Sequence, residues 1–529
     1  MDMSTSYWSY VPSGDAQLFT VVLLPAGDGK YPCIVTRTPY IDAHEKMTED
    51  EICALSATQY ATFTARGYAV VLQDCRGRGK SSGDCIPYIN ERADSRALYA
   101  WIRTQGFYNG EIFLKGASYS SSVHYCAAPF DPDIKGAVFG VQDTERYNIC
   151  YRNGCMKKAL HGGWYVGMYK AKSHLKKFYS PATFETLPLS LFTETVFGEP
   201  AEDFDEMLRS PRPTDPFWQT HAGGADARNA TKDLPFPALF TTGFYDIYTG
   251  GVLAMWQAMS PKTRSRCALL ISPYDHGDTY HEESGILFPL GRRTEKFGTD
   301  YELAWFDHIR KGEPARFEKG RITYYNLFEN EWHTTEALTA TDTLSIPLGD
   351  ESVSYTYNPF DPPRFRGGLS AAFGGGCFQD KAEQRNDIIT VYTLPFTEDI
   401  CIRGNMSATL RVSSDCEDTC FYIRVSIEKE PGRDFGIRDD ITTLCYQLGD
   451  YTPGEDVTLH FAFDGHAFCI KNGERLRVDI ASASADHYVR HTNQKGLYSE
   501  QVTARIAHNT VHLKESCLVL PILREEGKK

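Results

Sequence analysis

The sequence contains no apolar run that approaches the roughly 18 residues needed to span a membrane. Its first residues also lack the basic-then-apolar order of a secretory signal peptide. There is no internal repeat, and no low-complexity tract beyond Gly374-Gly375-Gly376. We therefore expect a cytoplasmic globular protein that is not embedded in a membrane.

Positive charge is in deficit. The chain has 529 residues and a formal net charge of −14, with a pI near 5.6. Such a surface repels nucleic acid backbones and anionic lipids. With 42% hydrophobic and 23% charged residues, the composition is that of a soluble globular protein. A small organic substrate is the expected partner, and a homo-oligomer remains open.

Paired cysteine motifs are also missing. The 15 cysteines are an odd number and are scattered without CxxC spacing or neighbouring histidines. We expect reduced, mostly buried thiols. The closest pairs are Cys150 with Cys155 and Cys416 with Cys420, for which a metal site or a disulfide is the alternative. No metal or organic cofactor is expected.

The chain is too long for a single hydrophobic core, which stops growing near about 250–300 residues. Short apolar runs alternate with helical stretches over residues 1–145 and 233–315, which predicts one α/β domain with a mainly parallel sheet. Residues 146–232 have helical patterns and no convincing strand, which predicts a helical insertion. Residues 316–529 show short alternating segments between turns, typical of an antiparallel β-sandwich.

One segment has the layout of a nucleophile elbow. The predicted strand Ile112–Leu114 leads through Gly116-Ala117-Ser118 into a probable helix. Small neighbours let the backbone turn sharply enough to project the serine hydroxyl from the sheet. The motif alone is weak, because Gly-x-Ser also occurs by chance and a serine that caps a helix would look the same.

A serine nucleophile needs a base, and the base needs an orienting acid. Asp246 follows one predicted strand, and His276 follows the next, so the chain order is serine, acid, histidine. Asp275 is a rival orienting acid. Among the other histidines, His124 is interpreted as structural, and a further group lies in the insertion, where it could line a pocket. That group is His161, His174 and His221.

Several ordered motifs resemble the X-Pro dipeptidyl-peptidase and cocaine-esterase (CocE/NonD) family of serine hydrolases, over nearly the whole chain. They are Arg37-Thr38-Pro39-Tyr40, the segment from Gln73 to Gly83, Trp101–Gln105 before Asn109-Gly110, Gly116–Tyr119, Gly243–Asp246, Trp305–His308, Arg411–Asp415 and Gly473–Val478. The resemblance makes Asp74–Gly83 a structural loop near the active site, and this segment lacks the ending of a nucleotide-binding P-loop.

The resemblance implies an α/β-hydrolase domain with a helical cap and a C-terminal jelly-roll sandwich. It also implies an oxyanion hole formed by the Tyr40 phenol and the Tyr119 backbone N–H. The alternative for Tyr40 is a packed aromatic residue with a solvated hydroxyl. The chain departs from the family pattern at Ser121 behind the elbow, and at Phe244, Ser272 and Tyr274 near the pocket.

Aromatic residues of the insertion suggest an apolar substrate pocket, although some must form the insertion's own core. The expected pocket residues are Trp164, Tyr165, Tyr169, Trp218 and Phe244.

The predicted reaction is acyl transfer to water, and the choice between an ester and a peptide bond after proline remains open. A dipeptidyl-peptidase needs an anion for the substrate ammonium, for which the candidates are Asp143, Glu145, Glu185 and Glu194. Ile247 and Tyr248 stand where relatives specific for α-amino-acid esters have acidic residues. A catalytically silent binding protein on the same fold is the alternative from a different functional class.

Overall fold

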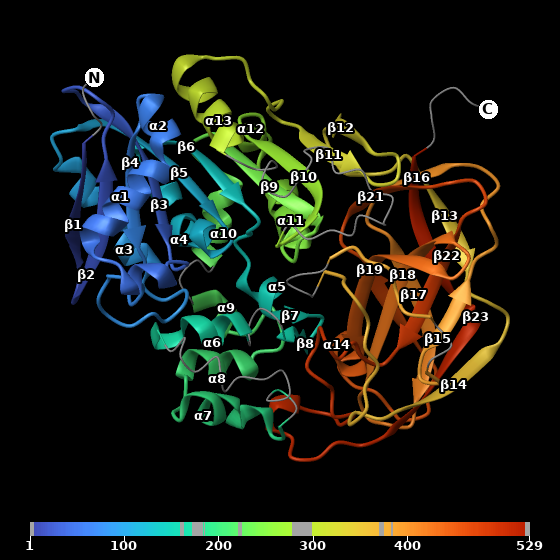
Figure 1. Cartoon of the computed structure of the whole chain (residues 1–529). Helices are drawn as coiled ribbons and strands as arrows, with labels where there is room; N and C mark the ends of the chain where they lie inside the picture. The colour runs from blue at the N-terminus through green and yellow to red at the C-terminus, as the bar shows by residue number, and fades with distance from the viewer. Residues whose placement is uncertain are drawn as a thin grey trace.

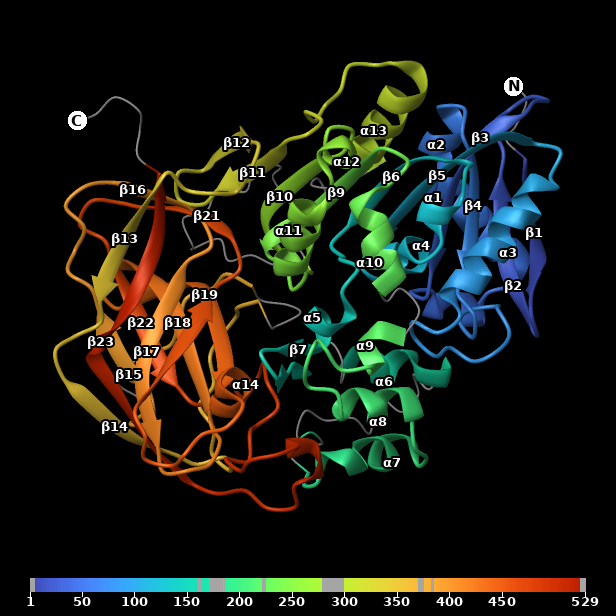
Figure 2. The ribbon, with the colours of Figure 1, turned by 180° about the vertical axis from the view of Figure 1, so that it is seen from behind.

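The computed structural model describes residues 5–158, 163–171, 184, 186–220, 225–277, 299–369, 375–381 and 385–523. Figure 1 shows an α/β domain in blue to yellow, a teal and green insertion beside it, and an orange and red β-sandwich. Figure 2 shows the same arrangement from behind. Within these described residues, no helix is long and apolar enough to cross a bilayer.

The α/β domain is built on a ten-stranded sheet in the order β1-β2-β4-β3-β5-β6-β9-β10-β11-β12. The strands from β4 to β11 along this order are parallel, and antiparallel pairs lie at both edges. The bounds are β1 Ser6–Ser13, β2 Ala16–Leu23, β3 Tyr31–Thr38, β4 Ala69–Asp74, β5 Tyr108–Ala117, β6 Ile134–Gly140, β9 Ala238–Tyr245, β10 Ala268–Asp275, β11 Ile322–Asn326 and β12 Glu331–Thr335.

Both faces of this sheet are buried, because helices cover each of them. On β3, Ile34 faces a cluster formed with one set of helices, whereas Val35 faces the set on the other side. The first set is α1 (Glu49–Gln59), α2 (Ala61–Ala65) and α13 (Thr299–Lys311). The second set is α3 (Glu91–Arg103), α4 (Tyr119–Tyr125) and α11 (Thr249–Ala258). The α/β class predicted from the alternating pattern is confirmed.

The insertion is mainly helical but includes a small hairpin that the sequence analysis does not predict. Strands β7 (Tyr151–Arg152) and β8 (Cys155–Met156) pair across Asn153 and Gly154, which both have positive φ. Asn-Gly is a strong hairpin signal, so a local cue for the turn is present in the sequence. The helices are α5 Arg146–Cys150, α6 Tyr165–Met168, α7 Phe192–Phe197, α8 Glu202–Leu208, α9 Phe217–Thr220 and α10 Ala225–Lys232.

The C-terminal part consists of two antiparallel sheets that share a buried core, and the β-sandwich prediction is confirmed. The larger sheet contains β13 Asp342–Pro347, β14 Ser352–Tyr357, β16 Ile400–Gly404, β17 Ser407–Ser414, β20 Val457–Ala462, β21 His466–Ile470 and β23 Ala507–Leu523. The smaller sheet contains β15 Ile389–Tyr392, β18 Cys420–Glu430, β19 Arg433–Thr443 and β22 Arg475–Ala481, and the short helix α14 spans Leu444–Leu448.

The expected boundary after residue 315 falls before the end of the first sheet. It places strands β11 and β12 in the sandwich, but β11 pairs in parallel with β10, and β12 extends the same sheet. Short alternating strands look alike whichever sheet accepts their hydrogen bonds, so the sequence pattern does not show that these two strands extend the first sheet.

The cysteines are mostly buried thiols, with one exception. Cys401 and Cys469 form a disulfide between the neighbouring strands β16 and β21. Neither sequence-adjacent pair is bonded. Instead, Cys155 of the insertion lies with its sulfur 3.6 Å from that of Cys420 in the sandwich.

A buried carboxylate joins α13 to the start of β4. Asp307 accepts hydrogen bonds from Tyr68 and Lys311 at 2.8 Å each, and from Arg66. Burial acts to raise the pKa of Asp307, but the bonds from Lys311, Tyr68 and Arg66 outweigh it and hold the pKa below its ordinary value. The carboxylate therefore contributes stability above the pKa of an unfolded aspartate, and this contribution is lost as the pH falls through the folded pKa.

We predict that Asp307→Asn lowers the free energy of unfolding by about 1.5–3 kcal/mol at pH 7, because it removes a charged acceptor of buried hydrogen bonds. The difference from wild type should begin to shrink below about pH 4, where the carboxylate of the unfolded chain takes up a proton, and should be lost as the pH falls through the lower pKa of the folded state. Urea unfolding followed by tryptophan fluorescence at both pH values measures it. Glu313→Gln is the matched control, since Glu313 and Arg66 are both partly exposed, and should cost less than about 1 kcal/mol. Equal losses in the two variants would contradict the prediction.

Candidate active site

Ser118 lies at a sharp turn between β5 and α4. Its backbone has φ 56° and ψ −135°, a region that L-residues rarely adopt. Its N–H donates to the Gly140 carbonyl at 2.9 Å, and its own carbonyl accepts from the Ser121 N–H at 2.8 Å. The turn is thus held from both sides, and it projects the hydroxyl beyond the end of the strand.

Gly116 permits this turn. A Cβ atom at Gly116 would lie 2.2 Å from the Ser120 carbonyl oxygen, so no larger residue fits without a backbone shift. Ser121, which departs from the family pattern, is fully buried, and its hydroxyl donates to the Gly140 carbonyl at 3.2 Å. Ser121 is therefore hydrogen-bonded to the end of β6, which also accepts the hydrogen bond from the Ser118 N–H.

His276 lies between Ser118 and Asp246. Its Nε2 atom is 3.0 Å from Ser118 Oγ, and its Nδ1 atom is 2.9 Å from Asp246 Oδ2. Asp246 is fully buried, and its other oxygen accepts the Tyr248 N–H at 2.8 Å. The rival acid Asp275 instead accepts backbone N–H groups of Gly277 and Gly375. The carboxylate nearest the imidazole is therefore that of Asp246.

Two hydrogen-bond donors converge beside the serine. The Tyr40 hydroxyl lies 3.4 Å from Ser118 Oγ, and the backbone N–H of Tyr119 faces the same phenol. Burial of the hydroxyl raises the pKa of Tyr40, although the ring is partly exposed, so the phenol stays protonated and able to donate at neutral pH. Trp164 donates its indole N–H to Tyr40 at 3.2 Å. This geometry suits an oxyanion.

Arg78 fixes the loop that carries Tyr40. This arginine is buried, and it donates to the Pro39 carbonyl at 3.1 Å and to the Asp42 carboxylate. A weaker contact of 3.4 Å reaches the Gly167 carbonyl in α6. The Asp74–Gly83 segment thus places Arg78 between the loop that carries Tyr40 and the insertion, as a structural loop would.

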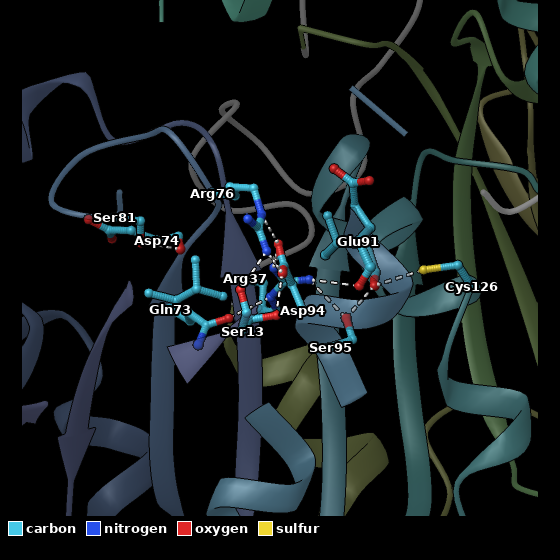
Figure 3. A network of polar contacts seen from close by, with 12 residues as sticks. Ser13, Arg37, Gln73, Asp74, Arg76, Ser81, Glu91, Asp94, Ser95 and Cys126 are labelled. Atoms are coloured by element: carbon cyan, nitrogen blue, oxygen red, sulfur yellow. Dashed lines mark hydrogen bonds and ion pairs between the residues drawn. The ribbon is translucent and has the colours of Figure 1, made fainter. Parts of the chain in front are cut away.

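Glu91 supports the other donor from behind. The Tyr119 phenol donates to the buried Glu91 carboxylate, and the Tyr88 N–H donates to that phenol at 2.8 Å. Burial raises the pKa of Glu91. Figure 3 shows Glu91 at one side of a larger polar network in which Arg37 contacts Gln73, Ser95 and Asp94. The network also includes Ser13 and Arg76, which both donate hydrogen bonds to the Asp94 carboxylate.

The predicted pocket aromatics divide into two groups. Trp164 is at the site, with its ring 5.0 Å from that of Tyr119 and 6.1 Å from that of Tyr88. The others lie in packed interior. Tyr165 and Tyr169 stack on each other, Trp218 bonds the Ser210 carbonyl among tyrosines of the insertion, and Phe244 stacks on His466 of the sandwich.

Tyr248 is a site residue that the sequence analysis notes only for its lack of charge. Its ring centre is 5.4 Å from that of His276. Burial raises the pKa of Tyr248 well above its ordinary value, with smaller contributions from nearby Tyr88 and Tyr40. The sequence cue for Tyr248 is its position two residues after Asp246, because the turn that follows β9 must bring it close to His276.

Of the candidate acids that the structure describes, Asp143 is the one buried close to the elbow. It lines a cavity of about 30 Å³ with Tyr88, Ser122 and Tyr125. Its Oδ1 accepts the Glu145 N–H at 2.9 Å, whereas Oδ2 has no hydrogen-bond partner among the described residues. Burial raises the pKa of Asp143 to about 7. Glu145 is half-buried and Glu194 is exposed on α7.

Glu185, His161, His174 and His221 fall outside the described residues. Buried His124 bonds the Tyr99 hydroxyl at 3.2 Å, and burial lowers the pKa of His124 to about 3, in keeping with a structural residue.

Comparison with known families decides the class. The family model for X-Pro dipeptidyl-peptidase (S15 family) matches residues 13–278, and the model for the X-Pro dipeptidyl-peptidase C-terminal non-catalytic domain matches residues 321–518. The chain belongs to the X-Pro dipeptidyl-peptidase (S15) family. As a member of this family, which includes cocaine esterase, it is a serine hydrolase.

Individual relatives of this S15-family chain cover its whole length. Cocaine esterase from Rhodococcus sp. (strain MB1 Bresler) is 24% identical, over 97% of this chain and 98% of that protein. The solved structure of an α-amino acid ester hydrolase has a TM-score of 0.79 at 18% identity, covering 98% and 96% of the two chains. An aminopeptidase from a marine sediment Thaumarchaeota archaeon has a TM-score of 0.77 at 17% identity, with the same coverage. These structures support the α/β-hydrolase fold with a C-terminal sandwich.

We predict that Gly116→Ala reduces reaction with a fluorophosphonate probe by about 10²-fold or more, because the added methyl group forces the elbow backbone to shift. Gly106→Ala is the matched control. Gly106 lies just before the start of β5, where an added Cβ meets nothing within 4 Å. Labelling rates of the two purified variants are compared with that of wild type. The prediction fails if both variants label at the wild-type rate.

Proposed function

We propose that this serine hydrolase cleaves carboxylic esters of small organic substrates through Ser118, with His276 as general base and Asp246 as the residue that orients it. The observation that carries the proposal is the continuous contact chain from Ser118 Oγ through His276 to Asp246, at 3.0 and 2.9 Å. A buried carboxylate fixes the tautomer of the imidazole and stabilises the imidazolium that forms.

The chemistry follows from this geometry. His276 Nε2 takes the hydroxyl proton while Ser118 Oγ bonds to the carbonyl carbon. The Tyr40 phenol and the Tyr119 N–H hold the resulting oxyanion. The imidazolium then gives its proton to the departing alcohol, which leaves an acyl-enzyme. Water attacks the acyl-enzyme with His276 again as base, and the carboxylic acid is released.

The surroundings of the serine favour an ester with an apolar or aromatic acyl group. Trp164, Tyr88 and Tyr248 crowd the site with rings, and Tyr248 occupies the turn after Asp246 beside the histidine. The full-length relative named cocaine esterase points the same way. A peptide bond after proline is the competing substrate class.

The test compares turnover of short acyl and benzoyl esters with that of a Gly-Pro anilide. We expect ester hydrolysis and fluorophosphonate labelling, both abolished in Ser118→Ala, where loss of a triad member costs on the order of 10⁶-fold. Tyr40→Phe should lower kcat by about 10²–10³-fold while KM changes little, because the donor acts on the oxyanion.

Cleavage of the anilide alone would discard the ester proposal. Labelling that persists in Ser118→Ala would show that Ser118 is not the nucleophile. A wild-type protein that the probe does not label would favour the catalytically silent binding protein instead.

A second candidate substrate class is an ester or amide whose acyl part carries an ammonium group. The observation in its favour is Asp143, a buried carboxylate with one oxygen unbonded among the described residues, in a small cavity that Ser122 of the elbow helix also lines. Burial makes the ionised carboxylate costly, nearby Lys157 offsets part of that cost, and a substrate cation would offset more of it. The solved structures named α-amino acid ester hydrolase and aminopeptidase are consistent with this class.

This candidate predicts a pH signature. Because burial raises the pKa of Asp143 to about 7, the carboxylate becomes ionised as the pH rises through neutrality. KM for an α-amino-acid ester should then fall by about fivefold from pH 6 to 7 and rise again above about pH 8, where the substrate ammonium loses its proton, whereas KM for the matched ester without the amino group should not follow this profile. Asp143→Asn should remove the difference. If wild type and Asp143→Asn have the same KM profile for the amino ester, the candidate is wrong.

A further inference from the structure

Trp164 gives the hydroxyl of Tyr40 a hydrogen bond whose direction is known. An indole N–H can only donate, so the phenol oxygen is the acceptor in their 3.2 Å contact. The backbone N–H of Tyr119 faces the same oxygen and can also only donate. The phenol oxygen therefore accepts from two N–H groups, and its own proton must point elsewhere.

The remaining contact of this hydroxyl is with Ser118. Among the described residues, Ser118 Oγ is the one oxygen within hydrogen-bond distance of the phenol, at 3.4 Å, and either hydroxyl could be the donor at that distance. Because Trp164 and Tyr119 engage the lone pairs of the phenol oxygen, the phenol is the donor and the serine oxygen is the acceptor.

The opposite end of this series of contacts has a fixed direction as well. An ionised carboxylate can only accept, so the Asp246 carboxylate takes the Nδ1–H of His276 at 2.9 Å. The neutral ring then has no proton on Nε2, which accepts the Ser118 hydroxyl at 3.0 Å. The series thus runs from a group that can only donate to a group that can only accept, and every proton between them points from Trp164 toward Asp246.

The direction of these protons matters for the reaction. If the Ser118 hydroxyl donated to Tyr40 instead, its proton would point away from the His276 nitrogen that must remove it. The indole bond opposes that reversed arrangement, because a phenol oxygen that already accepts two N–H groups is a poor acceptor for a third donor. A donor to the phenol oxygen also polarises the phenol O–H bond, which strengthens the hydrogen bond that the phenol can give to an oxyanion.

The surroundings of the indole hold it in this position. Trp164 lies at the start of α6, and its ring centre is 5.0 Å from that of Tyr119. Arg78 donates to the Pro39 carbonyl at 3.1 Å and contacts the Gly167 carbonyl of α6 at 3.4 Å. One buried side chain therefore anchors both the helix that carries the indole and the loop that carries the phenol.

We propose that Trp164 is a positioning residue that acts through Tyr40: its indole N–H sets the direction of the proton series and prepares the phenol to donate to the oxyanion. This role rests on the proposed function, in which Tyr40 is an oxyanion donor and His276 is the base. It gives the helical insertion, from which Trp164 comes, a part in the chemical step in addition to lining the pocket.

The experiment measures kcat and KM of the full chain for a short acyl ester in a double-mutant cycle. Trp164→Phe keeps an aromatic ring and removes the N–H. We expect kcat to fall by about three- to tenfold, the effect of losing a neutral hydrogen bond, while KM changes by less than about twofold. In the Tyr40→Phe background the same substitution should change kcat by less than about twofold, because the phenol through which it acts is absent.

Trp8→Phe is the matched control. Its indole donates to the Asp50 carboxylate at 2.8 Å from the edge strand β1, so the variant loses an indole hydrogen bond outside the site and should keep wild-type kcat and KM.

An alkyl trifluoromethyl ketone provides a second readout. Ser118 Oγ bonds to its carbonyl carbon while the hydroxyl proton passes to His276, and the adduct carries an oxyanion. Trp164→Phe should weaken the affinity for this ketone by about the same factor as it lowers kcat.

The outcomes distinguish this role from the proposed function. If Tyr40→Phe leaves kcat unchanged, the oxyanion assignment fails, and the role of Trp164 fails with it. If Tyr40→Phe lowers kcat as expected, the role of Trp164 alone is overturned by any of three results: wild-type kcat in Trp164→Phe, an equal loss of kcat in both backgrounds, or a rise in KM in place of the fall in kcat.

Discussion

The parallel alignment of β5, β9 and β10 is the constraint on which the site depends. Parallel strands end at the same edge of a sheet, so residues that follow these strands meet although they are far apart in the sequence. Ser118 follows β5, Asp246 follows β9, and His276 follows β10. The 2.9 and 3.0 Å contacts of the histidine then require only short turns at three strand ends. Ladder hydrogen bonds fix those ends more firmly than a loop scaffold would.

This constraint explains which parts of the site could be predicted from the sequence. A nucleophile elbow is local, since Gly116 and Ser118 lie within one strand–turn–helix unit. Asp246 and His276 each follow a buried apolar run, so placing them together needed only the inference of parallel strands. The pocket aromatics were harder, because whether a ring lines a cavity or fills a core depends on tertiary packing. Trp164 and Tyr165 are neighbours in sequence, yet it is Trp164 that donates to Tyr40, the proposed oxyanion donor.

The features that could not be predicted depend on partners distant in sequence. Cys401 and Cys469 are 68 residues apart, and their pairing follows from the register of β16 and β21. That β11 and β12 extend the first sheet was not predicted, because the side-chain pattern of β11 does not reveal that β10 is its neighbour. Phe244 contacts a sandwich histidine that no local motif marks. In each case the deciding interaction is a long-range hydrogen bond, disulfide or stacking contact, which local patterns do not encode.

The sandwich also stabilises the strand ends that carry the acid and the base. Tyr245, next to Asp246, donates its hydroxyl to the Gly436 carbonyl at 2.9 Å, and Phe244 stacks on His466 at 4.6 Å between ring centres. Asp275, next to His276, accepts the Gly375 N–H at 3.2 Å. A buried imidazole is costly to charge, and burial lowers the pKa of His466 well below its ordinary value, with nearby Arg438 acting in the same direction. The stacking contact therefore stays uncharged at neutral pH. Because the residues flanking both Asp246 and His276 contact the C-terminal domain, a shift of that domain would move these two side chains together. The non-catalytic domain is thus part of the scaffold that sets the geometry of the site.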